Sequence, residues 1–266
     1  MKNILSLTLL LIAITIKAQD YNSICQKGLE YIKNNDYPQA ATCFKEAASY
    51  SSNNYEKVYA LANLAYSYQM LNELPKALKE YDKALEIAPS EMTLLQQRAN
   101  IYLQLDSTEL ALNDYNELIR HEPSNTGALL CRAHIFTNMG EFDKAWKDYE
   151  QLQWWIPDNL SVRLGIAMLY QKEKRYDECL MVLSGMIEEF PEIAELYIAR
   201  SNLERERGHN ELAMIDLEKA IEIDPDNANN YILQAIIYEK MGKKDAARKC
   251  REKATLLGAD SSVTTF

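Results

Sequence analysis

Three histidines and five cysteines are the residues best suited to metal binding or nucleophilic catalysis. The histidines, His121, His134 and His209, form neither an H-E-x-x-H pair nor any other paired spacing. The cysteines are odd in number and include no C-x-x-C pair, unlike a zinc site or a disulfide framework. They are Cys25, Cys43, Cys131, Cys179 and Cys250. We therefore predict no catalytic residues, no cofactor and no metal. An enzyme whose site is assembled from distant residues remains an alternative.

Composition narrows the class of protein further. The chain has 266 residues, 47% of them hydrophobic, which is enough for a large core. Only 8 glycines and 7 prolines are present, which argues against a turn-rich all-β fold. The formal net charge of −10 would repel a phosphate backbone, so we expect no nucleic-acid partner.

The N-terminus has the pattern of an export signal. Residues 1–19 carry Lys2, an apolar run from Ile4 to Ile16 and a small residue, Ala18, near a cleavage point. The run is too short to cross a bilayer, and no later stretch is apolar enough to do so. We expect residues 1–19 to be removed and the protein to reach the periplasm or cell envelope of a bacterium, with secretion still open. Residues 259–266 are predicted to form a flexible C-terminal tail.

Prolines recur at a fixed interval in the rest of the chain. Pro89, Pro123, Pro157, Pro191 and Pro225 are each 34 residues apart. A period of this length is typical of a stacked repeat array, here placed at residues 20–258. With the prolines at position 32, the seven repeats lie near 21–54, 58–91, 92–125, 126–159, 160–193, 194–227 and 228–261.

Within each repeat, residue size follows position. Positions 8 and 20 are small, as in Ala99 and Ala111, whereas positions 11 and 24 are large, as in Tyr102 and Tyr115. Small residues allow two helices to approach closely, and large ones fill the space beside them. The pattern predicts a helix–turn–helix in every repeat.

Two positions predict the turns between helices. Position 15 is Asn, Asp or Gly in six repeats and Lys174 in the fifth; the first three types tolerate a positive φ. The residue after the proline is predicted to cap the next helix in four of five cases. Those residues are Ser90, Ser124, Asp158 and Asp226.

This pattern resembles the tetratricopeptide repeat, with its small residues at 8 and 20, aromatics at 11 and 24 and Pro at 32. The resemblance covers residues 21–261 and implies an all-α solenoid of about seven repeats wound into a right-handed superhelix. It also implies a groove, lined by the first helix of each repeat, that holds a peptide or a helix of a partner. The Lys and Asn of one subgroup's carboxylate clamp are absent, since Cys25 and Leu29 stand at those positions.

Position 9 of the first helix faces the groove in that family. In repeats two to six this position and one neighbour give the predicted partner-binding residues: Tyr66, Asn100, His134, Met168, Asn202 and Arg205. Amides outnumber charges among them and their neighbours, and an amide matches the donors and acceptors of an extended backbone. We predict an exported, non-catalytic scaffold that binds a protein or peptide segment. The alternative is a structural subunit of a cell-envelope complex that assembles through its ends or convex face.

Overall fold

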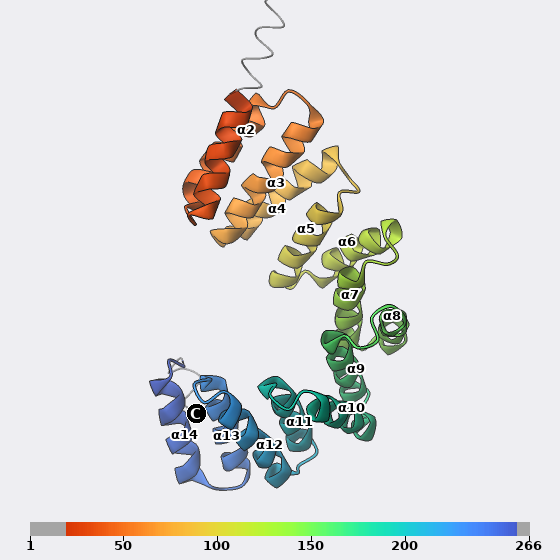
Figure 1. Ribbon diagram of the computed structural model, residues 1–266, viewed down its shortest axis with the longest axis vertical. Coiled ribbons are helices and arrows are strands. Elements are labelled where there is room, and N and C mark those ends of the chain that lie inside the picture. Colours follow the sequence, from red (N-terminus) through yellow and green to blue (C-terminus); the bar gives the residue numbers. More distant parts are fainter. Residues whose placement is uncertain (1–19, 260–266) are drawn as a thin grey trace, which may run out of the picture. The chain divides into compact units, whose positions relative to one another are not determined.

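The structure, a computed structural model, describes residues 20–259 (Figure 1). The predicted signal at 1–19 lies outside the described residues, as does all of the predicted tail except residue 259. A first helix runs through residues 20–33. It is followed by α2 (Tyr37–Tyr50), α3 (Asn54–Met70), α4 (Leu74–Ile87), α5 (Met92–Gln104), α6 (Thr108–His121), α7 (Thr126–Met139), α8 (Phe142–Trp155), α9 (Leu160–Lys172), α10 (Tyr176–Glu189), α11 (Ala194–Glu206), α12 (Asn210–Ile223), α13 (Ala228–Lys240) and α14 (Lys244–Leu256).

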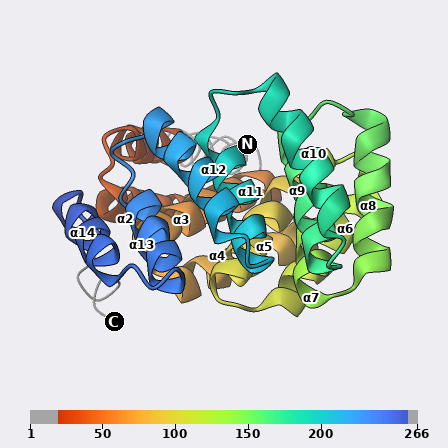
Figure 2. The same ribbon diagram turned by 90° about the horizontal axis from the view of Figure 1, so that it is seen from below.

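The predicted all-α class is confirmed, since residues 20–259 contain no strand and form consecutive helix–turn–helix pairs. The helices divide into two compact units, an N-terminal unit that ends at Ile135 and a C-terminal unit that begins at Phe136. In the N-terminal unit, each helix from α2 to α6 packs on the next. In the C-terminal unit, the same holds from α8 to α14; Figures 1 and 2 both show α13 beside α14. None of the helices between residues 20 and 259 has the length and apolar character needed to cross a bilayer.

The small residues lie where paired helices meet. Ala99 and Ala111 are fully buried between α5 and α6, and other residues at positions 8 and 20 are buried in the same way. In repeat six, position 8 is Ser201, whose hydroxyl donates a 2.7 Å hydrogen bond to the carbonyl oxygen of Ala213 at position 20. Even the polar residue at this position is therefore satisfied across the helix pair.

The turn within each repeat has the predicted backbone conformation. All seven residues at position 15 have a positive φ, including Lys174 at 61°. The other six are Asn35, Asn72, Asp106, Gly140, Gly208 and Gly242. Lys174 therefore adopts the left-handed conformation although its side chain disfavours it.

The predicted helix caps are wrong by one residue. Ser90, Asp158 and Asp226 lie inside turns, and the N-cap falls one position later, at Glu91, Asn159 and Asn227. The reason is a four-residue turn around the proline, closed by a 3.2 Å hydrogen bond from Glu91 N to Ala88 O. Proline takes the second position of that turn and the next residue the third, so the chain cannot begin a helix until one residue later. Asn159 then accepts a bond from Val162 N at 3.1 Å, as a cap does.

Candidate functional site

In the N-terminal unit, the predicted partner-binding residues lie on the first helix of successive repeats. Tyr66 on α3 is 36% exposed, with its ring edge-on to Tyr37 at 6.4 Å between centroids. Asn100 on α5 is half-buried and His134 on α7 is exposed. All three side chains are at least partly accessible to a ligand. Their role in binding stays a prediction.

Asn100 is held in place by two donors. Its Oδ1 accepts a 2.9 Å hydrogen bond from the hydroxyl of Tyr115 and a 3.1 Å bond from Nε2 of Gln96. Burial raises the pKa of Tyr115, so its hydroxyl keeps its proton and donates. The amide oxygen is therefore engaged within the protein, which orients the Nδ2 donor of Asn100 for another acceptor.

A similar contact occurs one repeat earlier. The hydroxyl of Tyr81, also at position 24, lies 3.4 Å from Oε1 of Gln69 on α3. Both tyrosines are almost fully buried, and burial also raises the pKa of Tyr81. Tyr81 and Tyr115 thus do more than fill space, because their hydroxyls contact amide oxygens on the first helices. From the sequence, these residues were predicted only to fill the core.

In the C-terminal unit, the predicted residues lie on α9 and α11. Met168 is half-buried on α9. On α11, Arg205 donates a 3.3 Å hydrogen bond from a terminal guanidinium nitrogen to Oδ1 of Asn202. Asn202 and Arg205 are therefore brought together, and the charge of Arg205 lies beside an uncharged amide.

Ion pairs that were not predicted from the sequence join neighbouring helices. Two nitrogens of Arg98 on α5 bind both carboxylate oxygens of Asp114 on α6, at 2.6 and 2.9 Å, and a third reaches Asp82 on α4. Only 5% of the Asp114 side chain is exposed. A bidentate pair of this kind fixes the relative geometry of the two helices and also stabilises their contact.

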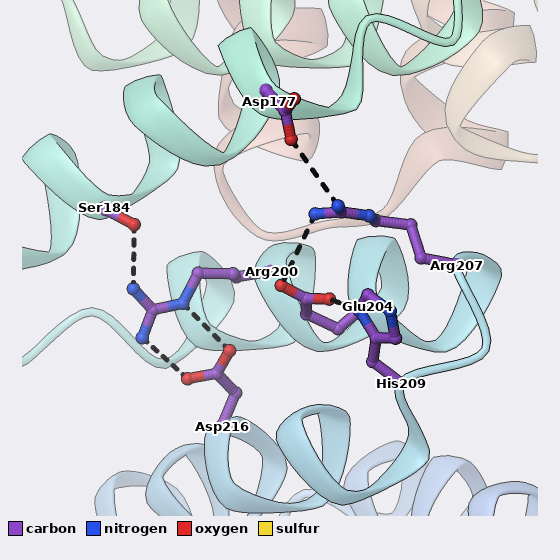
Figure 3. Close-up of polar contacts among 7 residues, drawn as sticks. All are labelled: Asp177, Ser184, Arg200, Glu204, Arg207, His209 and Asp216. Atoms are coloured by element: carbon purple, nitrogen blue, oxygen red, sulfur yellow. Dashed lines mark hydrogen bonds and ion pairs between the residues drawn. The ribbon is translucent and has the colours of Figure 1, made fainter.

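Repeat six contains the same arrangement, drawn in Figure 3. Arg200 on α11 binds both oxygens of Asp216 on α12, at 2.8 and 2.9 Å, and a further nitrogen donates to the hydroxyl of Ser184 on α10. These residues stand at positions 7, 23 and, in the preceding repeat, 25. Arginine at position 7 with aspartate at 23 was visible in the sequence and could have revealed the pair.

The glutamate that replaces an aromatic residue at position 11 also has a structural explanation. In other repeats a cation lies over the ring at this position, as Arg175 does over Tyr170 at 4.5 Å. In repeat six Glu204 replaces the ring, and Nδ1 of His209 lies 2.7 Å from its carboxylate (Figure 3). Arg207 lies 3.9 Å from the other oxygen of Glu204. A carboxylate contacted by His209 and Arg207 therefore replaces a cation–aromatic contact in repeat six.

Burial lowers the reactivity of two thiols, Cys25 and Cys179. Burial raises the pKa of Cys179 to about 11 and also raises that of Cys25. A protonated thiol is a poor nucleophile and a poor metal ligand. Between residues 20 and 259, no group of three or more His, Cys, Asp or Glu side chains is placed to hold a metal ion. Amide side chains therefore lie on first helices, and ion pairs join neighbouring helices.

Comparisons with known proteins agree with the fold. Family models described as "Tetratricopeptide repeat" match residues 25–91, 194–227 and 217–249. The structure is similar to that of a tetratricopeptide repeat protein from Parabacteroides merdae ATCC 43184, with 29% identity and a TM-score of 0.84. That likeness covers 92% of this chain and 96% of the other. No curated protein matches the chain.

More distant structures show the fold alone. The C-terminal part of a TPR repeat-containing protein from Cytophaga hutchinsonii is 18% identical, with a TM-score of 0.61 over 90% of this chain and 97% of that one. PilW, described as a widely conserved type IV pilus biogenesis factor, is 14% identical, with a TM-score of 0.63 over 78% of this chain and 98% of that one.

Proposed function

We propose that this chain, which contains tetratricopeptide repeats, is an exported, non-catalytic scaffold that binds a protein segment along its first helices. The observation that carries the proposal is the fixed orientation of Asn100. Its oxygen is held by Gln96 and Tyr115, so the amide nitrogen is left as an ordered donor on a partly exposed helix. An ordered donor binds a backbone carbonyl without a large entropic cost.

The chemistry of the neighbouring residues supports an uncharged contact. Tyr66 offers an aromatic surface and His134 an exposed ring, while Asn202 in the C-terminal unit offers a second amide. Arg205 is the one formal charge in this set. Binding through such groups should depend weakly on salt, since few ion pairs would be screened.

The test isolates the amide nitrogen of Asn100. Asn100→Asp keeps an oxygen for Gln96 and Tyr115 but replaces the donor with a carboxylate. Against a partner captured from the native envelope fraction, we expect a loss of about tenfold in affinity with an almost unchanged melting temperature. The matched control is Asn113→Asp on α6, an exposed position in the same repeat. Equal affinities for Asn100→Asp and wild type would refute the proposed contact.

Export is part of the proposal and rests on Lys2 and the apolar run from Ile4 to Ile16. N-terminal sequencing of protein from its native host should give a start at or near Gln19 or Asp20. An intact Met1 in the cytoplasmic fraction would contradict export without touching the binding proposal.

A second candidate function is a structural subunit of an envelope complex. It is favoured by apolar side chains on the second helices of the C-terminal unit, where Met181 on α10 is 69% exposed and Ile215 on α12 is 62% exposed. Trp154 near the end of α8 is 80% exposed. If such a complex forms, Met181→Gln with Ile215→Gln should remove the protein from it, whereas Asn100→Asp should not. The reverse result would favour the scaffold.

A further inference from the structure

A cleft rich in lysine lies on the N-terminal unit, away from the predicted partner-binding residues. It has a volume of about 670 Å³ and is formed by α2, α3 and α4, three helices that lie together in Figure 1. Its charged lining residues are Lys45, Lys57, Lys76, Lys79, Lys83 and Glu80. Five lysines and one glutamate give a formal charge of +4 in a chain whose net charge is −10.

The next repeat has the same cleft with the opposite charge. That cleft, of about 600 Å³, is formed by α4, α5 and α6 and contains four acidic side chains and one arginine. At position 25, Lys45 in the first cleft corresponds to Asp82 in the second, and at position 26 Lys83 corresponds to Glu117. The basic character therefore belongs to this one cleft and is no general property of the fold.

The arginine that occupies the second cleft is absent from the first. Arg98 at position 7 reaches both Asp114 and Asp82, whereas the first cleft has Leu64 at that position. Glu80, the counterpart of Asp114, is 9% exposed and pairs instead with Lys83 at 2.8 Å. Without an arginine side chain across it, the cleft has an apolar floor and positive walls.

Part of the positive charge is not neutralised within the protein. Lys83 pairs with Glu80, Lys76 pairs with Glu73 at 2.8 Å, and Lys57 donates to the carbonyl oxygen of Ala48. Among the described residues, neither Lys45 nor Lys79 has an acidic partner. On α4, Lys79 lies three residues after Lys76 and four residues before Lys83, and like charges at these two separations destabilise an isolated helix. An anionic partner would relieve this repulsion.

The arrangement fits a peptide better than a single anion. The three lysines of α4 extend over about 10 Å along the helix axis, which is longer than one phosphate group. Between the charged walls lie Leu61, Leu64 and Tyr68, which suit apolar side chains. A nucleic acid would be repelled by the acidic remainder of the chain. We propose that this cleft is a docking site for a segment of a partner protein that alternates carboxylates with apolar residues.

The test uses a fluorescent peptide of alternating glutamate and leucine. Saturable binding to the mature protein is expected by anisotropy, with an affinity that falls as salt is added. Lys45→Asp with Lys79→Asn places the second cleft's residues in the first and should weaken binding about tenfold. The control, Lys147→Asp with Lys240→Asn, makes the same charge change at exposed positions of α8 and α13 and should bind like wild type.

Further probes separate the possible ligands. A peptide with glutamine in place of glutamate should bind at least tenfold more weakly, and inorganic phosphate should fail to compete at millimolar concentration. Equal binding of the two peptides, competition by phosphate, or an equal loss in the control variant would each overturn the proposal. The Asn100→Asp variant should bind the acidic peptide normally, so failure here is distinct from failure of the first-helix proposal.

Discussion

Gly165 on α9 provides a direct test of how the C-terminal unit is packed. A Cβ added at this position would lie 2.5 Å from the hydroxyl of Tyr149 and 2.8 Å from two atoms of its ring. Unstrained carbon contacts lie at about 3.5–4.0 Å, so the overlap is large. Tyr149 is fully buried on α8 and cannot move into solvent. Gly165→Ala should therefore overpack the interface between α8 and α9.

The net effect combines two opposing contributions. Replacing glycine by alanine inside a helix ordinarily stabilises it by about 1 kcal/mol, whereas overpacking a core costs about 1–3 kcal/mol. The difference between these contributions is a fall in the free energy of unfolding of up to about 2 kcal/mol for Gly165→Ala. Two further glycines separate the contributions, since both have no atom within 4 Å of an added Cβ.

Gly185 lies inside α10, so Gly185→Ala should stabilise by about 0.5–1 kcal/mol. Gly208 has a φ of +85°, so Gly208→Ala should destabilise by about 1 kcal/mol through the backbone alone. The same chemical change thus has a different expected effect at each site. Urea unfolding followed by far-UV circular dichroism measures all three, and hydrogen exchange locates the change because repeat arrays unfold in segments.

A double-mutant cycle completes the test. Tyr149→Leu places a leucine at position 24 of repeat four, where repeat five already has Leu183. The fold should therefore tolerate the change with a loss of stability. In that background Gly165→Ala should cost less than it does in the wild type, with a coupling of about 1 kcal/mol. If Gly165→Ala is as stabilising as Gly185→Ala, the packing of α8 on α9 inferred here is wrong.

Three other predictions concern single positions. Ala111→Phe and Ala145→Phe should each cost about 1–3 kcal/mol or more in thermal or urea unfolding, because both alanines are fully buried between helices; wild-type unfolding for both would contradict the register. Lys174→Asn should raise stability by about 0.5 kcal/mol in the same assay, because asparagine tolerates the φ of 61° better, and no gain would show that the turn is unstrained. Burial raises the pKa of Cys179 from 9.0 to about 11, so the stability that its protonated thiol contributes is present below pH 9.0 and is lost as the pH rises toward 11. The free energy of unfolding of Cys179→Ala should therefore fall less over that pH range than the free energy of unfolding of the wild type.

The repeat columns predicted the fold because they record packing. Close contact between helices requires small residues at positions 8 and 20, and a left-handed turn favours Asn, Asp or Gly, so both requirements are visible as residue type. Lys174 shows the limit of this reasoning, since its positive φ follows from its place in the repeat and not from its side chain. The caps were misplaced because the turn after each proline uses one residue more than residue preferences reveal.

The candidate site was predicted less completely. The positions of Tyr66, Asn100 and Asn202 on first helices were predicted, but the hydrogen bond from Tyr115 that orients Asn100 was not. A tyrosine in a core column gives no sign of where its hydroxyl points. The pair of Arg98 and Asp114 was missed for a related reason, because charged residues at periodic positions are usually exposed on a helix surface.

Residues at positions that vary between repeats give the N-terminal unit two different surfaces, a cleft lined by lysines and a set of first helices that carry amides and aromatic rings. At position 7, arginine closes the cleft between neighbouring repeats by binding two acids, whereas Leu64 leaves the first cleft open. Lys45 and Lys79 then add charge at positions that packing does not constrain. The first helices of the same unit present amides and aromatic rings. Because salt screens the lysine cleft much more than the amide surface, salt dependence should identify which surface a given partner uses. A partner bound by Asn100 alone should keep its affinity as salt is added, while one bound by Lys45 and Lys79 should lose it. A partner that binds both surfaces should lose part of its affinity as salt is added. That loss should equal the loss caused by Lys45→Asp with Lys79→Asn.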